Sequence, residues 1–465
     1  MNFLKKIEKF NSNVCFIDEN EKKYTYENIL TKADLLSENL KERSLIFVLA
    51  DNSTECLTAY IGFFKKGIVQ MLLDPQISTN LLEELIETYK PNYILMPTSR
   101  IDDLKNYEVL KELGTFIILR LNKNSFYPIN KDLALLLSTS GSTGSKKFVR
   151  ISYENVYRNT KDIITYLDIN KDHRTVTTMP PFYTYGLSVI NTHLASGASI
   201  VVTKIKIIEK SFWKLINKQR VTSFAGVPYL YEILNKIKFE KLNLPHLEYF
   251  TQAGGALSKD LLKYFLNYSE KNKKKFIVMY GQTEATSRIS YLPYNMLKKK
   301  LGSVGIPIPG GKISLTNYES NNVKDGEIIY EGKNVSMGYA KSFVDLNKGD
   351  ENRGVLRTGD LGKSDKDGYI YITGRKSRDI KLFGHRVNLD EIEKILFKGG
   401  YNCLCYGLDN KVIIFHVDNK YNSKVLEYLS KITNINLDCF KLKKINKFPK
   451  NENGKVSYDK LEKFL

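Results

Sequence analysis

The sequence is poor in the residues that build metal centres and disulfide frameworks. Among its 465 residues, the five cysteines show no C-x-x-C pairing and the five histidines lie far from one another. Zinc sites and disulfide scaffolds need clustered thiols or imidazoles. The sequence therefore argues against both and is typical of a protein from a reducing compartment.

Long apolar runs and targeting segments are also missing. No apolar stretch approaches the roughly 18 residues that a membrane-spanning helix needs. The first residues, Met1-Asn-Phe-Leu-Lys-Lys, lack the apolar core of a signal peptide. The chain shows neither internal repeats nor an extended low-complexity tract. We expect a cytoplasmic protein without a membrane span.

Acidic residues are outnumbered by basic ones. The chain has 51 Asp and Glu against 71 Lys and Arg, which gives a formal net charge of +20. Most of the excess is lysine scattered along the chain, which is more typical of a solvated surface than of a nucleic-acid groove. We expect no nucleic-acid partner, whereas an acidic partner or a polyanionic cofactor stays open.

The first part of the chain alternates between helical and strand patterns. Apolar residues at helical spacing predict helices over 26–40, 54–65 and 79–89, and continuous apolar runs predict buried strands over 44–50, 69–73, 93–96 and 133–137. This alternation predicts an α/β fold with a mostly parallel sheet covered on both faces. In open sheets of this kind, ligands bind beyond the carboxyl ends of the strands.

A loop rich in hydroxyls, glycines and lysines follows the strand predicted at 133–137. It reads Ser138-Thr-Ser-Gly-Ser-Thr-Gly-Ser-Lys-Lys147. Glycines let backbone N–H groups approach an anion, while Ser, Thr and Lys add donors and charge. The spacing is not that of the common NTPase P-loop, because Gly141 and Gly144 are too close together. Alone, the loop predicts either a phosphate site or a surface turn.

Later strands end in turns that could complete such a site. The aromatic turn Pro180–Gly186 precedes a helix predicted over 187–194, and it either lines a pocket or caps the core. Strands near 222–229 and 248–257 end in glycines that allow a close backbone approach. The strand from Phe276 ends in Tyr280-Gly-Gln-Thr-Glu284, which offers a ring for a base, a hydroxyl for phosphate and a carboxylate for Mg²⁺.

The predicted secondary structure changes after about Leu301. Short strands separated by Gly and Asp turns predict a β-rich subdomain over about 301–375. A basic connector over 376–381 follows, and the remaining residues form a small mixed segment with a polar loop at 449–455.

Four motifs in this order resemble those of the adenylate-forming (AMP-binding) superfamily, which includes acyl-CoA synthetases, aryl acid ligases, luciferases and peptide synthetase adenylation domains. They are Ser140–Lys147, Tyr280–Glu284, Arg357–Asp360 with Gly374-Arg375, and Gly454-Lys455. The resemblance spans nearly the whole chain. It implies an N-terminal domain of stacked α/β subdomains over 1–375, a small mobile α+β C-terminal domain over 376–465, and a hinge near 375–379.

The resemblance also implies the reaction. ATP would activate a carboxylic acid as an acyl-adenylate with release of pyrophosphate, and a thiol of CoA or of a carrier protein's phosphopantetheine would then take the acyl group. The implied catalytic residues are Lys147, Thr283, Glu284 and Lys455. Of these, Glu284 would hold Mg²⁺. The implied nucleotide-binding residues are Thr139, Ser140, Gly141, Ser142, Thr143, Gly144, Gly254, Gly255, Tyr280, Gly281, Asp360 and Arg375.

The chain departs from the family pattern at several places. Ser377 stands at the hinge, where Asp or Lys is usual. Lys381 and Gly384, by contrast, fit the family segment that lines the channel used in the second step, the transfer to the thiol. Lys146 and Phe148 replace the usual Pro and Gly beside Lys147, and Tyr183 replaces a His that is common in the aromatic motif. A tyrosine cannot titrate near neutral pH.

The substrate is defined less sharply than the reaction. The predicted pocket residues, Phe182, Tyr183, Gly186, Phe224 and Gly226, permit an aryl or an aliphatic acid. Amino-acid-activating relatives often place an Asp where this chain has Gly186, which disfavours an α-amino acid. The acceptor is predicted to be CoA or an acidic acyl carrier protein acting in trans. The alternative is a nucleotide-binding relative that is catalytically silent or stops at the adenylate.

Overall fold

The computed structural model describes residues 3–121, 126–139, 147–316, 324–382, 385–408, 411–433, 435–450 and 456–465. Contacts divide the chain into two compact units. Unit 1 comprises Met1–Lys312 with Glu331–Leu356, and unit 2 comprises Ile313–Tyr330 with Arg357–Leu465. The domain boundary expected near 375 stays a prediction.

Unit 1 contains an eight-stranded sheet with the order β19-β9-β8-β4-β3-β5-β7-β6. Its central, mutually parallel strands are β8 (Leu133–Ser138), β4 (Val69–Leu73), β3 (Leu45–Leu49) and β5 (Tyr93–Pro97). Its antiparallel flanks are β19 (Tyr339–Ala340), β9 (Phe148–Ser152), β7 (Phe116–Leu121) and β6 (Tyr107–Leu113). Within β3, Ile46 and Val48 pack into one core and Phe47 and Leu49 into another. The continuous apolar runs therefore form strands buried on both faces, as predicted.

Helices supply these two cores. The first core includes residues of α1 (Tyr26–Ser37) and α2 (Thr54–Lys66), and the second includes residues of α3 (Thr79–Tyr89). The hydroxyls of Ser53 and Ser78 accept backbone N–H groups at the starts of α2 and α3, which fixes where these helices begin. Helix α1 ends earlier than expected because Leu40 N bonds to Ser37 O, and this turn brings Leu40 into the first core.

A second sheet of unit 1 has nine strands in the order β16-β15-β14-β13-β12-β10-β11-β1-β2. Its parallel strands are β14 (Lys275–Tyr280), β13 (Tyr249–Gln252), β12 (Ser223–Gly226), β10 (Arg174–Val176), β11 (Ser199–Val201) and β1 (Val14–Ile17). Antiparallel strands at its edges are β15 (Ser290–Leu292), β16 (Ile306–Pro307) and β2 (Lys23–Thr25). The α/β fold class is thus confirmed, with antiparallel edges that the alternating pattern had not predicted.

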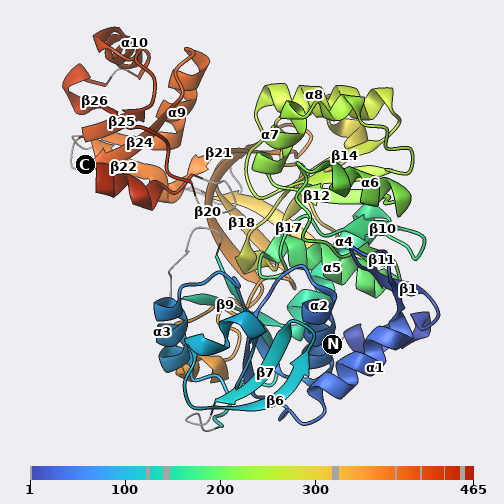
Figure 1. Cartoon of the computed structure of the whole chain (residues 1–465). Helices are drawn as coiled ribbons and strands as arrows, with labels where there is room; N and C mark the ends of the chain where they lie inside the picture. Colours follow the sequence, from blue (N-terminus) through green and yellow to red (C-terminus); the bar gives the residue numbers. More distant parts are fainter. Residues whose placement is uncertain are drawn as a thin grey trace. The chain divides into compact units, whose positions relative to one another are not determined.

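The helices of this part of unit 1 are α4 (Tyr153–Leu167), α5 (Thr184–Ser196), α6 (Lys210–Lys218), α7 (Pro228–Lys236) and α8 (Lys259–Lys271). Figure 1 shows α7 and α8 beside β12 and β14. In the described part of the chain, no helix has the length and apolarity of a membrane span.

Unit 2 contains part of the predicted β-rich segment and the C-terminal elements, while β16 and β19 of that segment belong to sheets of unit 1. The four-stranded sheet of unit 2 has the order β17 (Gly311–Thr316), β18 (Asp325–Gly332), β20 (Val355–Ser364) and β21 (Ile370–Arg375). The hairpin β22 (Asp379–Leu382) and β23 (His385–Asn388) follows. A further core joins α9 (Leu389–Lys398) and α10 (Ser423–Thr433) to a sheet of β24 (Cys403–Leu408), β25 (Lys411–His416) and β26 (Phe440–Lys444). Figure 1 shows both helices beside this sheet.

Candidate active site

Three segments that are distant in the sequence meet at the carboxyl ends of β8 and β14. Thr283 follows β14 in a single 3-10 turn, and its hydroxyl accepts a hydrogen bond from the Thr184 hydroxyl at 3.0 Å. The same Thr283 oxygen lies 3.5 Å from Ser138 O at the end of β8. Thr184 is the first residue of α5, and both threonines are buried. The base of the predicted phosphate loop, the aromatic turn and the Tyr280–Glu284 motif therefore converge.

Tyr339 connects two of the predicted catalytic residues. The Lys147 ammonium lies 3.4 Å from the centroid of the Tyr339 ring, a cation–π contact. The Tyr339 hydroxyl donates a hydrogen bond to Glu284 Oε1 at 2.7 Å. Burial, and then the nearby Glu284 carboxylate, raises the pKa of Tyr339, so this hydroxyl stays protonated as a donor. A lysine and a carboxylate thus flank one phenol beside Thr283.

Several predicted residues lie outside the described part of the chain: Ser140, Gly141, Ser142, Thr143, Gly144, Lys146, Gly384 and Lys455. Thr139 and Lys147 border the first of these gaps. Lys381 is described only as part of the backbone of β22, and Ser377 only as part of a 3-10 turn. Their proposed roles stay predictions.

Phe148 stands where the family usually has glycine, and its side chain packs in the core. It opens β9, is buried, and belongs to the second core of the eight-stranded sheet. Its ring meets that of Tyr89 edge to face, with centroids 5.5 Å apart. This position therefore contributes to the fold of the sheet rather than to the loop.

Tyr280 and Gly281 occupy the end of β14. Tyr280 is only 8% exposed, and its hydroxyl accepts a hydrogen bond from Gln282 Nε2 at 3.4 Å. A Cβ atom on Gly281 would lie 1.8 Å from Ser287 O. A side chain at this position would collide with the turn that follows the motif. Glycine is therefore required here, whether or not it contacts a nucleotide.

The turn after Glu284 is unusual in its backbone. Thr286 and Ser287 have φ angles of 52° and 114°, in a region that residues with side chains rarely adopt. Asn334 Nδ2 holds the turn by donating to Ala285 O and Arg288 O, both at 2.8 Å. Strained backbone of this kind persists where the surroundings impose it, as at binding sites. Arg288, which follows this turn directly, is 2% exposed.

Gly254 and Tyr183 are in direct contact. Gly254 has a φ of 87°, and a Cβ atom there would lie 2.5 Å from the Tyr183 hydroxyl. Gly255 follows, and its carbonyl accepts a hydrogen bond from Gln252 Nε2 at 2.8 Å. Burial raises the pKa of Tyr183 to about 12, with Arg288 acting in the opposite direction. Tyr183 therefore presents a neutral phenol to the end of β13.

The other predicted pocket residues are held by packing. A Cβ atom on Gly186 would lie 2.5 Å from Pro180 O, so the first turn of α5 has no room for an aspartate there. Phe182 packs against the first core. Phe224 stacks on Phe250 with ring centroids 5.6 Å apart. A Cβ atom on Gly226 would lie 2.8 Å from Leu230 Cδ2.

Asp360 and Arg375 are neighbours within unit 2. They pair across β20 and β21, and Arg375 Nε donates to Asp360 Oδ1 at 3.1 Å. Asp360 is 4% exposed, so its carboxylate is held in one place. The arrangement brings the two residues together, and their roles at the ribose stay predictions.

The predicted hinge lies between two anchored residues. Lys376 Nζ bonds to Glu327 Oε2 of β18 at 3.0 Å. Arg378 bonds to Asp390 Oδ1 of α9 and to Cys405 O of β24, both at 2.7 Å. Ser377 therefore stands between a residue tied to the four-stranded sheet and one tied to the C-terminal elements, while the hinge itself stays a prediction.

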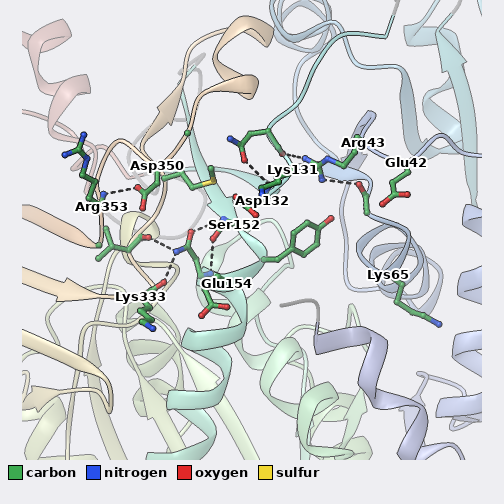
Figure 2. Close-up of a pocket in the computed structure, with 18 residues that line it drawn as sticks. Glu42, Arg43, Lys65, Lys131, Asp132, Ser152, Glu154, Lys333, Asp350 and Arg353 are labelled. Atoms are coloured by element: carbon green, nitrogen blue, oxygen red, sulfur yellow. Dashed lines mark hydrogen bonds between the residues drawn. The ribbon is translucent and has the colours of Figure 1, made fainter.

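A cavity of about 730 Å³ lies at the other edge of the eight-stranded sheet. Its wall includes Arg43, Gly67 and Asp132, which precede the parallel strands β3, β4 and β8. Figure 2 shows Arg43 and Asp132 in this wall. Side chains of both signs line it, among them Glu42, Lys65, Glu154, Lys333 and Asp350. Because ligands of open α/β sheets bind at the carboxyl ends of the strands, this cavity lies apart from the candidate site.

Sequence reasoning missed Thr184, Arg288 and Tyr339. Thr184 lies within the aromatic turn, and Arg288 follows Glu284 by four residues. Tyr339 is 55 residues from Glu284 and belongs to no motif, so no local signal could have found it.

Comparisons with known proteins agree with this geometry. The AMP-binding enzyme family matches residues 3–340. A probable 4-coumarate–CoA ligase 2 of Dictyostelium discoideum is 27% identical over 404 residues, covering 77% of this chain and 72% of the relative. A 2-succinylbenzoate–CoA ligase of Staphylococcus aureus is 24% identical over 493 residues, covering 96% of each.

The fold is also that of solved structures. The o-succinylbenzoate coenzyme A synthetase of Bacillus subtilis, solved with ATP and magnesium ion, has a TM-score of 0.80 at 20% identity and covers 99% of both chains. Because the family match extends over most of the sequence, this chain belongs to the AMP-binding enzyme family.

Proposed function

We propose that this protein is an AMP-forming ligase that joins a carboxylic acid to CoA. The observation that carries the proposal is the convergence of Ser138, Thr184 and Thr283, with Glu284, Tyr339 and Lys147 beside them. These side chains offer hydroxyls, a cation and a carboxylate at the carboxyl ends of parallel strands, where a nucleotide is expected. The CoA ligases among the relatives support the same reaction.

The reaction has two steps. First, a carboxylate oxygen of the acid attacks the α-phosphorus of ATP, the bond from that phosphorus to the bridging oxygen breaks, and pyrophosphate leaves. Second, the CoA thiolate attacks the acyl carbon, the bond to the adenylate oxygen breaks, and AMP leaves. Because two anions must meet in the first step, most of the catalytic task is to neutralise charge and hold an in-line geometry.

We assign these tasks to Thr283 and Lys147, near the ends of β14 and β8, and to Asp360 and Lys455. Thr283 donates to the α-phosphate in place of its long 3.5 Å contact with Ser138 O, while its oxygen continues to accept from Thr184 at 3.0 Å. Lys147 supplies positive charge to the outer phosphates. Asp360 accepts hydrogen bonds from the ribose hydroxyls, and Lys455 contacts both the acid and the α-phosphate.

The residues present suit Mg²⁺. In proteins, Mg²⁺ is usually held by one or two carboxylates together with substrate phosphates. Glu284 is such a carboxylate: Tyr339 bonds to its Oε1, and among the described residues no partner bonds to its Oε2. When bound, Mg²⁺ supplies charge that offsets the phosphates. No group of three or more His, Cys, Asp or Glu side chains in the described residues forms a cage for another metal.

CoA is the acceptor that we favour, and an acyl carrier protein in trans is the alternative. Both are anionic, and the net charge of +20 favours either encounter. The five cysteines are buried free thiols, which supports the cytoplasm as the compartment.

The decisive experiment is ATP–pyrophosphate exchange with a panel of carboxylic acids. We expect at least one acid to stimulate exchange, and we expect mass spectrometry to detect its CoA thioester once CoA is added. Replacing CoA by a purified acyl carrier protein identifies the alternative acceptor. Exchange that no acid stimulates, in a protein that binds ATP, would favour a catalytically silent relative.

Two variants test the assigned residues. Thr283→Val keeps the shape of the side chain and removes its hydroxyl, so we expect exchange to fall about 100-fold. Thr88→Val, on the exposed face of α3, is the matched control and should leave exchange unchanged. Lys455→Ala should abolish exchange and retain ATP binding. Unchanged exchange in Thr283→Val or Lys455→Ala would remove that residue from the mechanism.

A further inference from the structure

A second, narrow cavity of about 20 Å³ lies inside unit 1 between α4, α5 and the strands β12 to β14. Polar side chains that are almost wholly buried contribute to its wall: Arg288 and His193 are 2% exposed, Ser223 1% and Tyr249 4%. Among the described residues, no hydrogen-bond partner exists for Arg288 Nε or His193 Nε2, whereas Ser223 Oγ and Tyr249 OH lie near each other without an ideal hydrogen-bond geometry. Because buried polar atoms are nearly always paired, these atoms indicate a polar occupant.

Arg288 carries the one fixed charge of this wall. Its guanidinium donates to Ser287 Oγ at 2.8 Å and to Ser188 Oγ at 3.3 Å, and it lies 4.2 Å from the centroid of the Tyr185 ring. No Asp or Glu is among the described residues that line the cavity, and no described carboxylate forms an ion pair with Arg288. A guanidinium is always charged, and a buried charge without a counter-ion is costly. The missing partner is therefore an anion.

The other polar groups do not compete with Arg288 for that anion. His193 Nδ1 lies 2.8 Å from Val189 O, which only accepts, so Nδ1 carries the ring proton and Nε2 has a free electron pair. Burial lowers the pKa of His193 to about 4, so the ring is neutral at neutral pH. Burial raises the pKa of Tyr249, which keeps its hydroxyl a donor. Ser223 and Tyr249 thus add hydroxyls, and no charge, to the wall of the cavity.

The wall of the cavity reaches the same strand ends as the candidate active site. This wall includes Ala225, Thr251 and Met279, each one residue before the end of its strand, where the predicted site residues lie. Arg288 also influences the pKa of Tyr183, whose hydroxyl contacts Gly254. An acid whose reacting carboxylate lies at these strand ends would therefore extend toward Arg288.

Resting on the proposed function, we propose that the acid activated by this enzyme is a short dicarboxylic acid, and that Arg288 binds its second carboxylate in this cavity. The charge of Arg288 supplies the selectivity. The cavity volume of about 20 Å³ exceeds that of one water probe only slightly, which limits the occupant of this end to a small group.

Matched acids test the proposal on the unaltered enzyme. Malonate, succinate and glutarate are compared in pyrophosphate exchange with their monomethyl esters and with the monocarboxylic acids of the same length. We expect at least one dicarboxylic acid to exceed its monomethyl ester by at least about 100-fold in kcat/KM, because the ester leaves the buried Arg288 without a counter-ion. A wild-type enzyme that uses the ester or the monocarboxylic acid as well as the dicarboxylic acid overturns the proposal.

Variants then connect the selectivity to Arg288. Arg288→Met keeps length and removes charge, and we expect its preference for the dicarboxylic acid to fall to near unity, whereas Arg288→Lys retains part of it. Arg120→Met, on an exposed arginine of β7 that pairs with Glu108, is the control and keeps the wild-type preference. ATP binding and the melting temperature report whether Arg288→Met folds. A folded Arg288→Met that keeps the wild-type preference overturns the proposal, and if it does not fold, Arg288→Lys and the wild-type panel decide.

The result also separates this inference from the proposed function. Exchange that is stimulated only by acids without a second acidic group overturns the role of Arg288 and leaves the ligase reaction standing. Exchange that no acid stimulates contradicts both.

Discussion

Tyr339→Phe isolates one contact of the candidate site. The change removes the hydroxyl that donates to Glu284 Oε1 at 2.7 Å and keeps the ring 3.4 Å from the Lys147 ammonium. Among the described residues, no other side chain donates to the Glu284 carboxylate. We therefore expect Glu284 to lose its fixed orientation while Lys147 keeps its aromatic contact. Since Tyr339 acts through Glu284, it is a positioning residue.

The expected size follows from the kind of hydrogen bond. Hydrogen bonds to charged groups contribute about 1.5–3 kcal/mol. Tyr339 and Glu284 are both partly exposed, so we take the lower end, about 1.5 kcal/mol. This corresponds to an affinity for Mg²⁺ that is weaker by about 10-fold. Changes to groups that orient metal ligands weaken metal binding by about 10- to 100-fold, which agrees.

The assay is the rate of pyrophosphate exchange as a function of Mg²⁺ concentration at saturating ATP. Tyr339→Phe should need about 10-fold more Mg²⁺ for half-maximal rate, with a maximal rate close to wild type. Tyr294→Phe is the control, because Tyr294 is 50% exposed and also lies under a lysine, 5.4 Å from Lys275 Nζ. A wild-type Mg²⁺ requirement in Tyr339→Phe, or an equal shift in Tyr294→Phe, would refute the reasoning.

Three further changes test packing and charge. Gly186→Ala places a Cβ atom 2.5 Å from a backbone oxygen, so we expect a loss of about 2 kcal/mol or more in urea unfolding, and an unchanged midpoint would contradict it. Burial raises the pKa of Asp162 from 3.8 to about 6. The ionised carboxylate therefore destabilises the fold increasingly as the pH rises between these two values. Replacing it in Asp162→Asn should raise the melting temperature more at about pH 7.5 than at about pH 4.5. Equal gains at both pH values would contradict this. Arg378→Met leaves the carboxylates of Asp390 and Glu393 without their buried partner and should destabilise the C-terminal elements by about 3–5 kcal/mol, seen as faster proteolysis there than in wild type.

Much of the fold could be predicted from local sequence. The apolar runs at 45–49, 69–73 and 133–137 form buried strands. A strand that is apolar on both faces is stable only when both faces are removed from water. The helices α2 and α3 begin where Ser53 and Ser78 cap them, a signal carried by neighbouring residues. The antiparallel edges were not predicted, because strand order depends on partners distant in the chain.

The motif glycines show how a correct pattern can have another physical reason. Gly281 and Gly254 were expected to bring backbone close to a nucleotide. In the structure, Gly281 makes room for Ser287 O and Gly254 for the Tyr183 hydroxyl. Their nucleotide contacts stay predictions, while the demand for glycine is already explained inside the fold.

The sequence by itself determined the fold class, the family and the residue types at the carboxyl ends of β8 and β14, because these depend on runs and motifs that are contiguous in the chain. Only the tertiary structure decided that Tyr339 links Lys147 to Glu284 and that Arg288 is buried without a carboxylate partner among the described residues. The physical reason is that both facts depend on which groups meet after folding. Whether a charged side chain has a partner depends on all the groups that pack around it in the folded protein.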